Sequence, residues 1–288
     1  MNVLLTLADF KIRDPFILPD PATQTYYLYA SDYKTGVMAY RSKDLRHWSE
    51  PAPVFRRPDS FWGGHAIWAP EVHKLGAHYY LFVTFDRPDG RSTAIFRAEK
   101  PDGPFVVFSD EAVTAPEEQC LDGTPWVDAS GQNWMIYCEE WLRVHDGAMR
   151  AVRMAPDWSR REGESVLLFH ASQAPWVKPI DDRGNYVTDG PYLHHRPGQP
   201  LVMTWSSFCW PNGSYSLAVA HSESGKVEGT WTHAEKPIYN NDGGHGMIFR
   251  DFDGRLLLVL HSPNKPVEHA HIFEIDDTHG VSIVREVT

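Results

Sequence analysis

One short pattern recurs at nearly regular intervals along the chain: turn residues, often an acid or a glycine, lead through a proline into an apolar run. The four copies with a proline read IRDPFIL, IWAPEVH, LDGTPWV and VTDGPYL. Their prolines at 15, 70, 125 and 191 are separated by 55, 55 and 66 residues, and His245 of GGHGMIF follows 54 residues later. Five similar units in 288 residues average about 58 residues each, a period typical of propellers and other repeat architectures.

Each unit contains short apolar or aromatic runs separated by turns rich in Asp, Gly, Pro and Asn, which is typical of an all-β chain. The second runs read TYYLYAS, HYYLFVTF, NWMIYCEE, PLVMTWSS and RLLLVLHS, and third runs include GVMAYRS, STAIFRAE, AMRAVRM and SLAVAHSE. Roughly four strands per unit at this period predict a five-bladed β-propeller. No linker interrupts the pattern, so we predict a single domain over residues 1–288.

Charge and composition exclude several classes of partner. The formal charge of −11 argues against nucleic acid or an anionic membrane, since both require basic patches. No run approaches the ~20 apolar residues of a membrane span. The three cysteines, Cys120, Cys138 and Cys209, give neither a disulfide framework nor a zinc knuckle. With no basic segment and only a short apolar run at the N-terminus, we expect a cytoplasmic protein.

The repeated corners predict one shared site. In a propeller the first strand of each blade lies nearest the axis, so the starts of these strands converge on one face. Strand two is antiparallel to strand one, and the loop that leaves it returns to that face. We therefore expect Asp14, Asp122 and Asp189 to occupy equivalent positions in three blades around one pocket. The loops SDYK, FDRPDGR, CEEWLR, SSFCWPNG and HSPN are expected to form its rim. A turn acid that accepts backbone N–H bonds is the alternative for any one of them.

Five motifs in this order and at this spacing resemble those of the family 43 glycoside hydrolases: RDPFI, WAPEV, LDGTPWV, DGP and GGHGMIF. The resemblance extends from Asp14 to about Pro263. It implies a five-bladed propeller that hydrolyses arabinofuranosides or β-xylosides with inversion. By the same resemblance Asp14 is the general base, and Asp122 positions the general acid and raises its pKa.

The residue that matches the general acid departs from the family, which has glutamate where this chain has Asp189. Inversion needs a carboxylic acid and a carboxylate ~6.5–9.5 Å apart, and aspartate is one methylene shorter than glutamate. A shifted backbone could let Asp189 serve, another carboxylate could replace it, or the protein could bind sugar without cleaving it. Glu140 and Glu139 are candidate replacements, because both leave strand two of blade three on the side of Asp122. Glu140 is slightly favoured, because it is nearer the aromatic rim.

The resemblance also places His245 near the axis, beside a structural calcium or sodium ion; a hydrogen-bonded core histidine is the alternative. No cofactor is required for the chemistry. Aromatic rings that stack on sugars are further candidates, although most propeller tryptophans pack between blades. They are Trp62, His65, Trp68, Trp126, Trp141, Trp205 and Trp210. Glu71 is interpreted as structural.

The sequence thus predicts an inverting glycosidase that removes terminal arabinofuranosyl or xylosyl units from small oligosaccharides, with no nucleic acid or membrane partner. Two alternatives remain open. One is a five-bladed glycosidase of the related clan, such as a fructosidase, although IRDPF lacks the Asn-Asp-Pro-Asn form of that clan. The other is a non-catalytic sugar-binding propeller, which the loss of the glutamate favours and the presence of Asp14 and Asp122 opposes.

Overall fold

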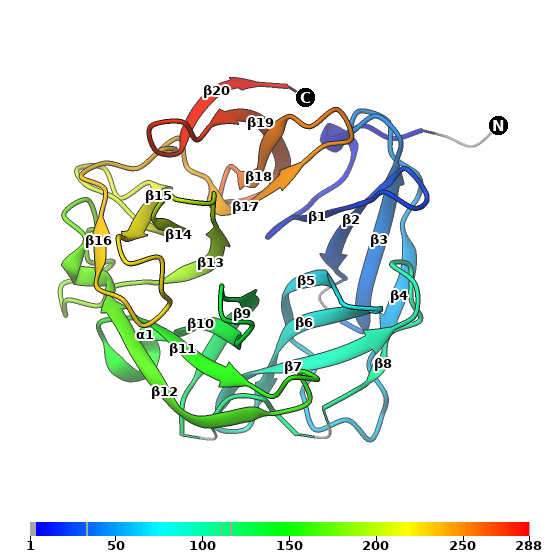
Figure 1. The fold of residues 1–288 in the computed structure, drawn as a ribbon, viewed down its shortest axis with the longest axis horizontal. Helices are drawn as coiled ribbons and strands as arrows, with labels where there is room; N and C mark the ends of the chain where they lie inside the picture. Colours follow the sequence, from blue (N-terminus) through cyan, green and yellow to red (C-terminus); the bar gives the residue numbers. More distant parts are fainter. Residues whose placement is uncertain (1–3, 33, 110, 116, 288) are drawn as a thin grey trace.

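The computed structural model describes residues 4–32, 34–109, 111–115 and 117–287. Five antiparallel sheets of four strands each stand in a ring around a central axis (Figure 1). In every sheet the hydrogen-bonded order of the strands is their order in the chain. The five-bladed propeller is therefore confirmed. Tyr33, in the first predicted rim loop, lies outside the described residues.

The blades are contiguous segments of chain. The strands of blade one are β1 (Phe16–Asp20), β2 (Thr25–Ser31), β3 (Gly36–Ser42) and β4 (Ala52–Arg56). Those of blade two are β5 (Ile67–Leu75), β6 (His78–Arg87), β7 (Gly90–Ala98) and β8 (Val106–Val107). Those of blade three are β9 (Cys120–Val127), β10 (Asn133–Glu139), β11 (Ala148–Met154) and β12 (Arg161–His170).

Blade four consists of β13 (Asp189–His194), β14 (Leu201–Phe208), β15 (Tyr215–Ser222) and β16 (Trp231–His233). Blade five consists of β17 (Gly244–Arg250), β18 (Leu256–Ser262), β19 (His269–Asp276) and β20 (Ser282–Glu286). The short helices are η1 (Leu7–Asp9), α1 (Trp141–Val144) and η2 (Ala171–Gln173). Within the described residues, no helix has the length and apolar character needed to cross a membrane.

The second strand of each blade is buried on both faces, which explains its continuous apolar sequence. All seven residues of β10 and of β18 are buried. A sheet covered on both sides selects uninterrupted apolar runs rather than the alternation of a half-exposed sheet. Between blades three and four, Trp205 packs against Trp176 and Phe169, with ring centroids 4.9 and 5.2 Å apart. Apolar packing of this kind between adjacent blades supports the ring.

A left-handed residue marks the corner of every innermost strand. The φ angles are 53° at Asp14, 45° at Ala69, 58° at Asp122, 53° at Gly190 and 52° at His245. The pairing with the second strand shifts register at this point in β5, β9, β13 and β17. Such a bulge bends the strand and re-aims its side chains, which suits the approach to the axis.

These corners correct one prediction. Asp14 and Asp122 occupy the same position, but Asp189 comes one residue before its left-handed residue, Gly190. Aligning the corners on their prolines misplaces blade three. There Asp122 is followed directly by Gly123, and Pro125 comes three residues after Asp122. Only glycine fits the blade-four corner easily, because a Cβ on Gly190 would lie 2.7 Å from the His245 ring.

The first and last blades meet at a seam without exchanging a strand, as each sheet is complete from consecutive segments. The Ile12 backbone N–H donates to the Glu268 carbonyl at 2.9 Å. Tyr26 stacks on Phe252, with ring centroids 4.3 Å apart. An Arg13 Nη1 hydrogen bond to Glu268 Oε1, at 3.3 Å, adds a charged contact. Backbone and side-chain contacts thus close the ring.

Candidate active site

A pocket of about 350 Å³ lies where the innermost strands begin. All five blades contribute to its wall. The lining residues are Arg13, Asp14, Trp68, Arg91, Leu121, Asp122, Glu140, Trp141, Ile180, Val187, Asp189, Phe208, His245 and Lys265. The pocket brings together the three predicted aspartates, Glu140 and His245. Residues from the predicted rim loops of blades two, three and four also line it.

Asp14 is held by positive and hydrogen-bonding groups, most of which come from blade five. Its Oδ1 lies 3.1 Å from His245 Nδ1, and its backbone N–H donates to His261 Nδ1 at 3.2 Å. Arg13, anchored to the Asn264 side chain at 3.0 Å, lies with its Nε 3.7 Å from Asp14 Oδ1. Burial acts to raise the pKa of Asp14, but the charges of His245 and Arg13 outweigh it and hold that pKa below its ordinary value. Asp14 is therefore a carboxylate at neutral pH.

The surroundings of Asp189 shift its pKa in the opposite direction from that of Asp14. Burial raises its pKa, and the negative charge of Asp122 raises it further, to about 8. Asp122 is tied to the neighbouring corner, because its Oδ2 accepts a hydrogen bond from the Gly190 N–H at 3.0 Å. Burial also raises the pKa of Asp122, to about 6, against the opposing charge of His245. Asp189 thus keeps its proton at a pH where Asp14 has lost its own.

Tyr215 and His261 are functional candidates that the sequence analysis missed. The Tyr215 hydroxyl donates to Asp189 Oδ2 at 3.1 Å, and its ring stacks on His261 with centroids 5.6 Å apart. Burial raises the pKa of Tyr215 well above 10, so its hydroxyl remains a donor. Burial lowers the pKa of His261 to about 4, which leaves the imidazole neutral beside Asp14. Because β18 ends on the pocket face and β15 begins there, strand direction was the available signal for both.

The two glutamates of blade three are both engaged by arginines. Glu139 accepts from Arg150 Nε at 2.5 Å, away from the pocket wall. Glu140 precedes helix α1, lines the pocket and forms an ion pair with Arg91. Burial raises the pKa of Glu140, and the Arg91 charge partly opposes that rise. The Arg91 guanidinium also lies over the Trp68 ring, 4.6 Å from its centroid.

Two of the predicted aromatic contacts, Trp68 and Trp141, line the pocket. The prediction for Trp205 is wrong, because this residue is 0% exposed between blades and no sugar can reach it. Trp62 faces a separate surface pocket and packs against Phe61.

Three other predicted contacts lie outside the pocket lining. His65 lies beside Arg57, with Nε2 3.4 Å from Nη2. Trp126 pairs across the sheet with Trp134, toward the end of β9 remote from the axis corner, and its ring meets His195 edge-on. Trp210 is 55% exposed, with the Lys178 ammonium over its ring, and is also absent from the lining.

The predicted ion beside His245 finds no ligand set in the part of the chain described. There, no group of three or more His, Cys, Asp and Glu side chains is arranged to hold a metal. His245 Nδ1 faces Asp14 and Asp122 at 3.1 and 3.9 Å, so it is engaged by carboxylates. Calcium prefers six to eight oxygen ligands. We therefore assign no step to an ion, and the metal role of His245 stays a prediction.

Known proteins similar to this chain include a matching enzyme family and solved structures with the same fold. The model of the glycosyl hydrolases family 43 matches residues 7–280. A structure of an endo-arabinase from Bacteroides thetaiotaomicron is 38% identical, covers 97% of this chain and 99% of its own, and superposes with a TM-score of 0.93. No curated protein matches the chain.

Two more distant structures are similar in fold alone. The α-L-arabinofuranosidase from Lactobacillus brevis is 16% identical, with 97% of both chains covered and a TM-score of 0.75. The RS223 β-xylosidase is also 16% identical, with 99% of this chain and 98% of that one covered and a TM-score of 0.74.

Proposed function

The chain belongs to glycosyl hydrolases family 43, and on that premise we propose that it is an inverting glycosidase that removes terminal arabinofuranosyl or xylosyl units from oligosaccharides. The observation that carries the proposal is the separation of two protonation states in one pocket. Asp14 has a lowered pKa, while the pKa of Asp189 is raised to about 8. Inversion requires such a pair, one carboxylate and one carboxylic acid.

In the proposed reaction Asp14 accepts a proton from water as the water oxygen attacks the anomeric carbon. The glycosidic C–O bond breaks, and Asp189 donates its proton to the departing oxygen. The products are a free sugar with inverted configuration and a shortened oligosaccharide. Asp14 ends protonated and Asp189 ionised, so proton exchange with solvent restores the starting state.

Asp189 is a better candidate for the acid than Glu140. The Arg91 ion pair stabilises the ionised form of Glu140, whereas Asp122 stabilises the protonated form of Asp189. Tyr215 then acts as a positioning residue. Its hydroxyl fixes one oxygen of Asp189 and leaves the other to carry the proton. Glu140, with Arg91 and Trp68, is proposed to contact the sugar hydroxyls.

Among the candidate sugars we favour arabinofuranosyl units. The 38% identical structure bears the name endo-arabinase, and this similarity spans nearly the whole of both chains. Its name also makes cleavage within an arabinan chain an outcome that the assay has to separate from terminal cleavage. A non-catalytic sugar-binding propeller is the second candidate function, favoured by the aspartate at the position of the family glutamate.

Hydrolysis followed by proton NMR tests the proposal. The substrates are 4-nitrophenyl α-L-arabinofuranoside, 4-nitrophenyl β-D-xyloside and linear arabino- and xylo-oligosaccharides. We expect arabinose as the first product from arabino-oligosaccharides, initially as the anomer of inverted configuration. Early release of mixed longer oligosaccharides would instead indicate internal cleavage. Retained configuration would support the related clan, and a lack of turnover with saturable binding would support the non-catalytic alternative.

A further inference from the structure

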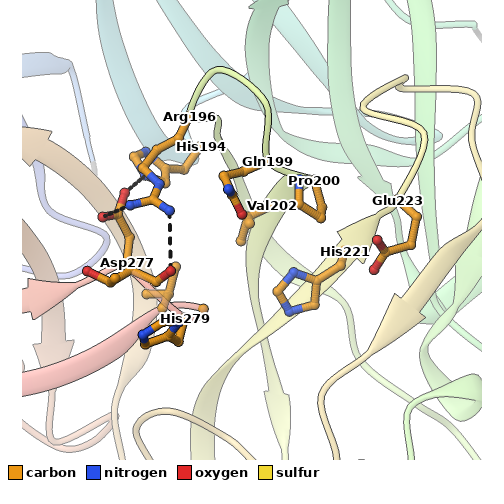
Figure 2. Close-up of a pocket in the computed structure, with 12 residues that line it drawn as sticks. His194, Arg196, Gln199, Pro200, Val202, His221, Glu223, Asp277 and His279 are labelled. Carbon is orange, nitrogen blue, oxygen red and sulfur yellow. Dashed lines mark hydrogen bonds and ion pairs between the residues drawn. The ribbon is translucent and has the colours of Figure 1, made fainter.

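A second pocket lies on the face of the propeller opposite the aspartates. Its residues come from the β13–β14 turn, the end of β15 and the β19–β20 loop, between blades four and five (Figure 2). First strands begin on the aspartate face, so the ends of first and third strands lie on the other face. The pocket has a volume of about 390 Å³, within the ~300–1,000 Å³ typical of small-molecule sites.

Charged and polar groups at one side of this pocket are paired with one another. Asp277 receives His194 Nε2 on one carboxylate oxygen at 2.8 Å and Arg196 Nη1 on the other at 3.3 Å. Arg196 also donates through Nη2 to the Thr278 carbonyl at 3.3 Å. Figure 2 shows this cluster at one side, across the pocket from His221 and Glu223. The Arg196 guanidinium at this side of the pocket is therefore already paired with a carboxylate.

Three further polar side chains, Gln199, His221 and His279, line this pocket beside the carboxylate of Glu223. Among the residues that the structure describes, none forms a hydrogen bond with the side chains of Gln199, His221 or His279. An amide and a neutral imidazole each offer both a donor and an acceptor. Burial lowers the pKa of His221, which keeps its ring neutral at pH 7. Apolar surface of Val202 and Val281 lines the same pocket.

We propose that this pocket is a second saccharide-binding site, separate from the catalytic pocket, that holds a neutral sugar unit of the substrate chain. Sugar hydroxyls are both donors and acceptors, so they match unpaired groups of the same double character. The C–H face of a sugar ring packs on apolar side chains. The choice of sugar rests on the proposed function, but the site itself requires none of the catalytic aspartates.

Other ligand classes fit this pocket less well. An anion would meet the carboxylates of Asp277 and Glu223, and Arg196, the arginine among the described lining residues, is already engaged by Asp277. A metal ion would need a convergent ligand set, and the described residues contain none. A neutral polyhydroxylated ligand requires neither a free positive charge nor a metal ligand set, and it leaves the Arg196–Asp277 pair intact.

The test measures binding and turnover separately on the full chain. Affinity electrophoresis in gels containing linear arabinan or xylan would use an Asp14→Asn background, in which turnover is removed. The test variant adds Gln199→Ala and His221→Ala, and the matched control adds His78→Ala, which lies at the β5–β6 turn on the same face in blade two. We expect the double substitution to weaken apparent affinity by roughly tenfold or more, since two hydrogen-bonding groups are lost. We expect the control to match its parent.

In a background with Asp14 intact, Gln199→Ala with His221→Ala should leave turnover of the aryl glycoside within about twofold of the unsubstituted chain. Unchanged retardation in the double variant overturns the second site, as does competition by inorganic phosphate. Absence of any retardation, with normal aryl hydrolysis, overturns the second site and leaves the proposed function intact. Retardation that depends on Gln199 and His221 in a protein without hydrolytic activity supports the site and contradicts the proposed function.

Discussion

The corners of blades one and four each contribute an aspartate to the same pocket, yet the two side chains are held in opposite protonation states. Asp14 is itself the left-handed residue, and its carboxylate faces His245 and Arg13. Asp189 precedes the left-handed Gly190 and receives a hydrogen bond from the neutral Tyr215 hydroxyl. A shift of one residue at an equivalent blade corner therefore changes the electrostatic partners. Position, rather than residue type, separates the proposed base from the proposed acid.

Removing the charge at the blade-one corner should have the largest effect. Asp14→Asn keeps the shape of the side chain but cannot accept the proton of water, so kcat/KM should fall by about 10³-fold or more. The loss should be equal for aryl glycosides and oligosaccharides, because both need an activated water. Steady-state kinetics measures this, with thermal unfolding as the check on folding. Residual activity within tenfold of the original would exclude Asp14 as the base.

Substitution of Asp189, at the blade-four corner, should affect oligosaccharides far more than aryl glycosides. Asp189→Asn should lower turnover of oligosaccharides by about 10²- to 10³-fold. It should lower turnover of 4-nitrophenyl glycosides by less than about tenfold, because a phenol leaves with little protonation. Asp189→Glu keeps an acid and should retain far more oligosaccharide activity than Asp189→Asn. Glu140→Gln is the matched comparison: the selective pattern there, and not at Asp189, would transfer the acid role to Glu140.

The pH dependence of kcat/KM should report both corners at once. In the proposed mechanism, activity needs Asp14 ionised and Asp189 protonated. It should fall on the acidic side where Asp14 gains a proton, below the ordinary aspartate range, and on the alkaline side near pH 8, where Asp189 loses one. A pH–rate profile of the aryl glycoside and an oligosaccharide measures both limbs. An alkaline limb that persists unchanged in Asp189→Asn would assign it to another group.

Tyr215→Phe should have the smallest effect on activity. It is the most direct test of how the blade-four corner sets the protonation state of Asp189. The Tyr215 hydroxyl stabilises ionised Asp189, so its removal should raise the pKa of Asp189 and move the alkaline limb upward. We expect a loss of about 3- to 10-fold in kcat on oligosaccharides, the effect of one hydrogen bond, with little change in KM. Tyr79→Phe is the matched control, because the Tyr79 hydroxyl donates to Asp20 at 3.0 Å in another part of the ring. If the alkaline limb of the pH–rate profile stays at the same pH in Tyr215→Phe, Tyr215 has only a packing role.

The fold was predictable because its signals are periodic. Five corner motifs and the apolar second strands recur at blade spacing, and the structure has its strands in those places. The membership of the pocket was partly predictable, since strand direction alone brings Asp14, Asp122 and Glu140 to one face.

Details that depend on side-chain packing were not predictable. Composition cannot distinguish the fully buried Trp205 from the pocket-lining Trp68. The offset of Asp189 was hidden because the proline follows the left-handed residue directly in blades one, two and four but comes three residues after it in blade three. The contact between Tyr215 and Asp189 joins residues 26 positions apart across one sheet. Such a contact leaves no local sequence pattern.

The seam between blades one and five has a consequence for assembly. Asp14 belongs to the first blade, yet the histidines that contact it, His245 and His261, come from the last. Arg13 is likewise anchored by Asn264 and Glu268. During synthesis the first four blades can emerge before any of these partners exists. Asp14, the proposed base, therefore acquires its lowered pKa only when the ends of the propeller meet. If it has that role, enzymatic activity directly reports that the last blade has docked.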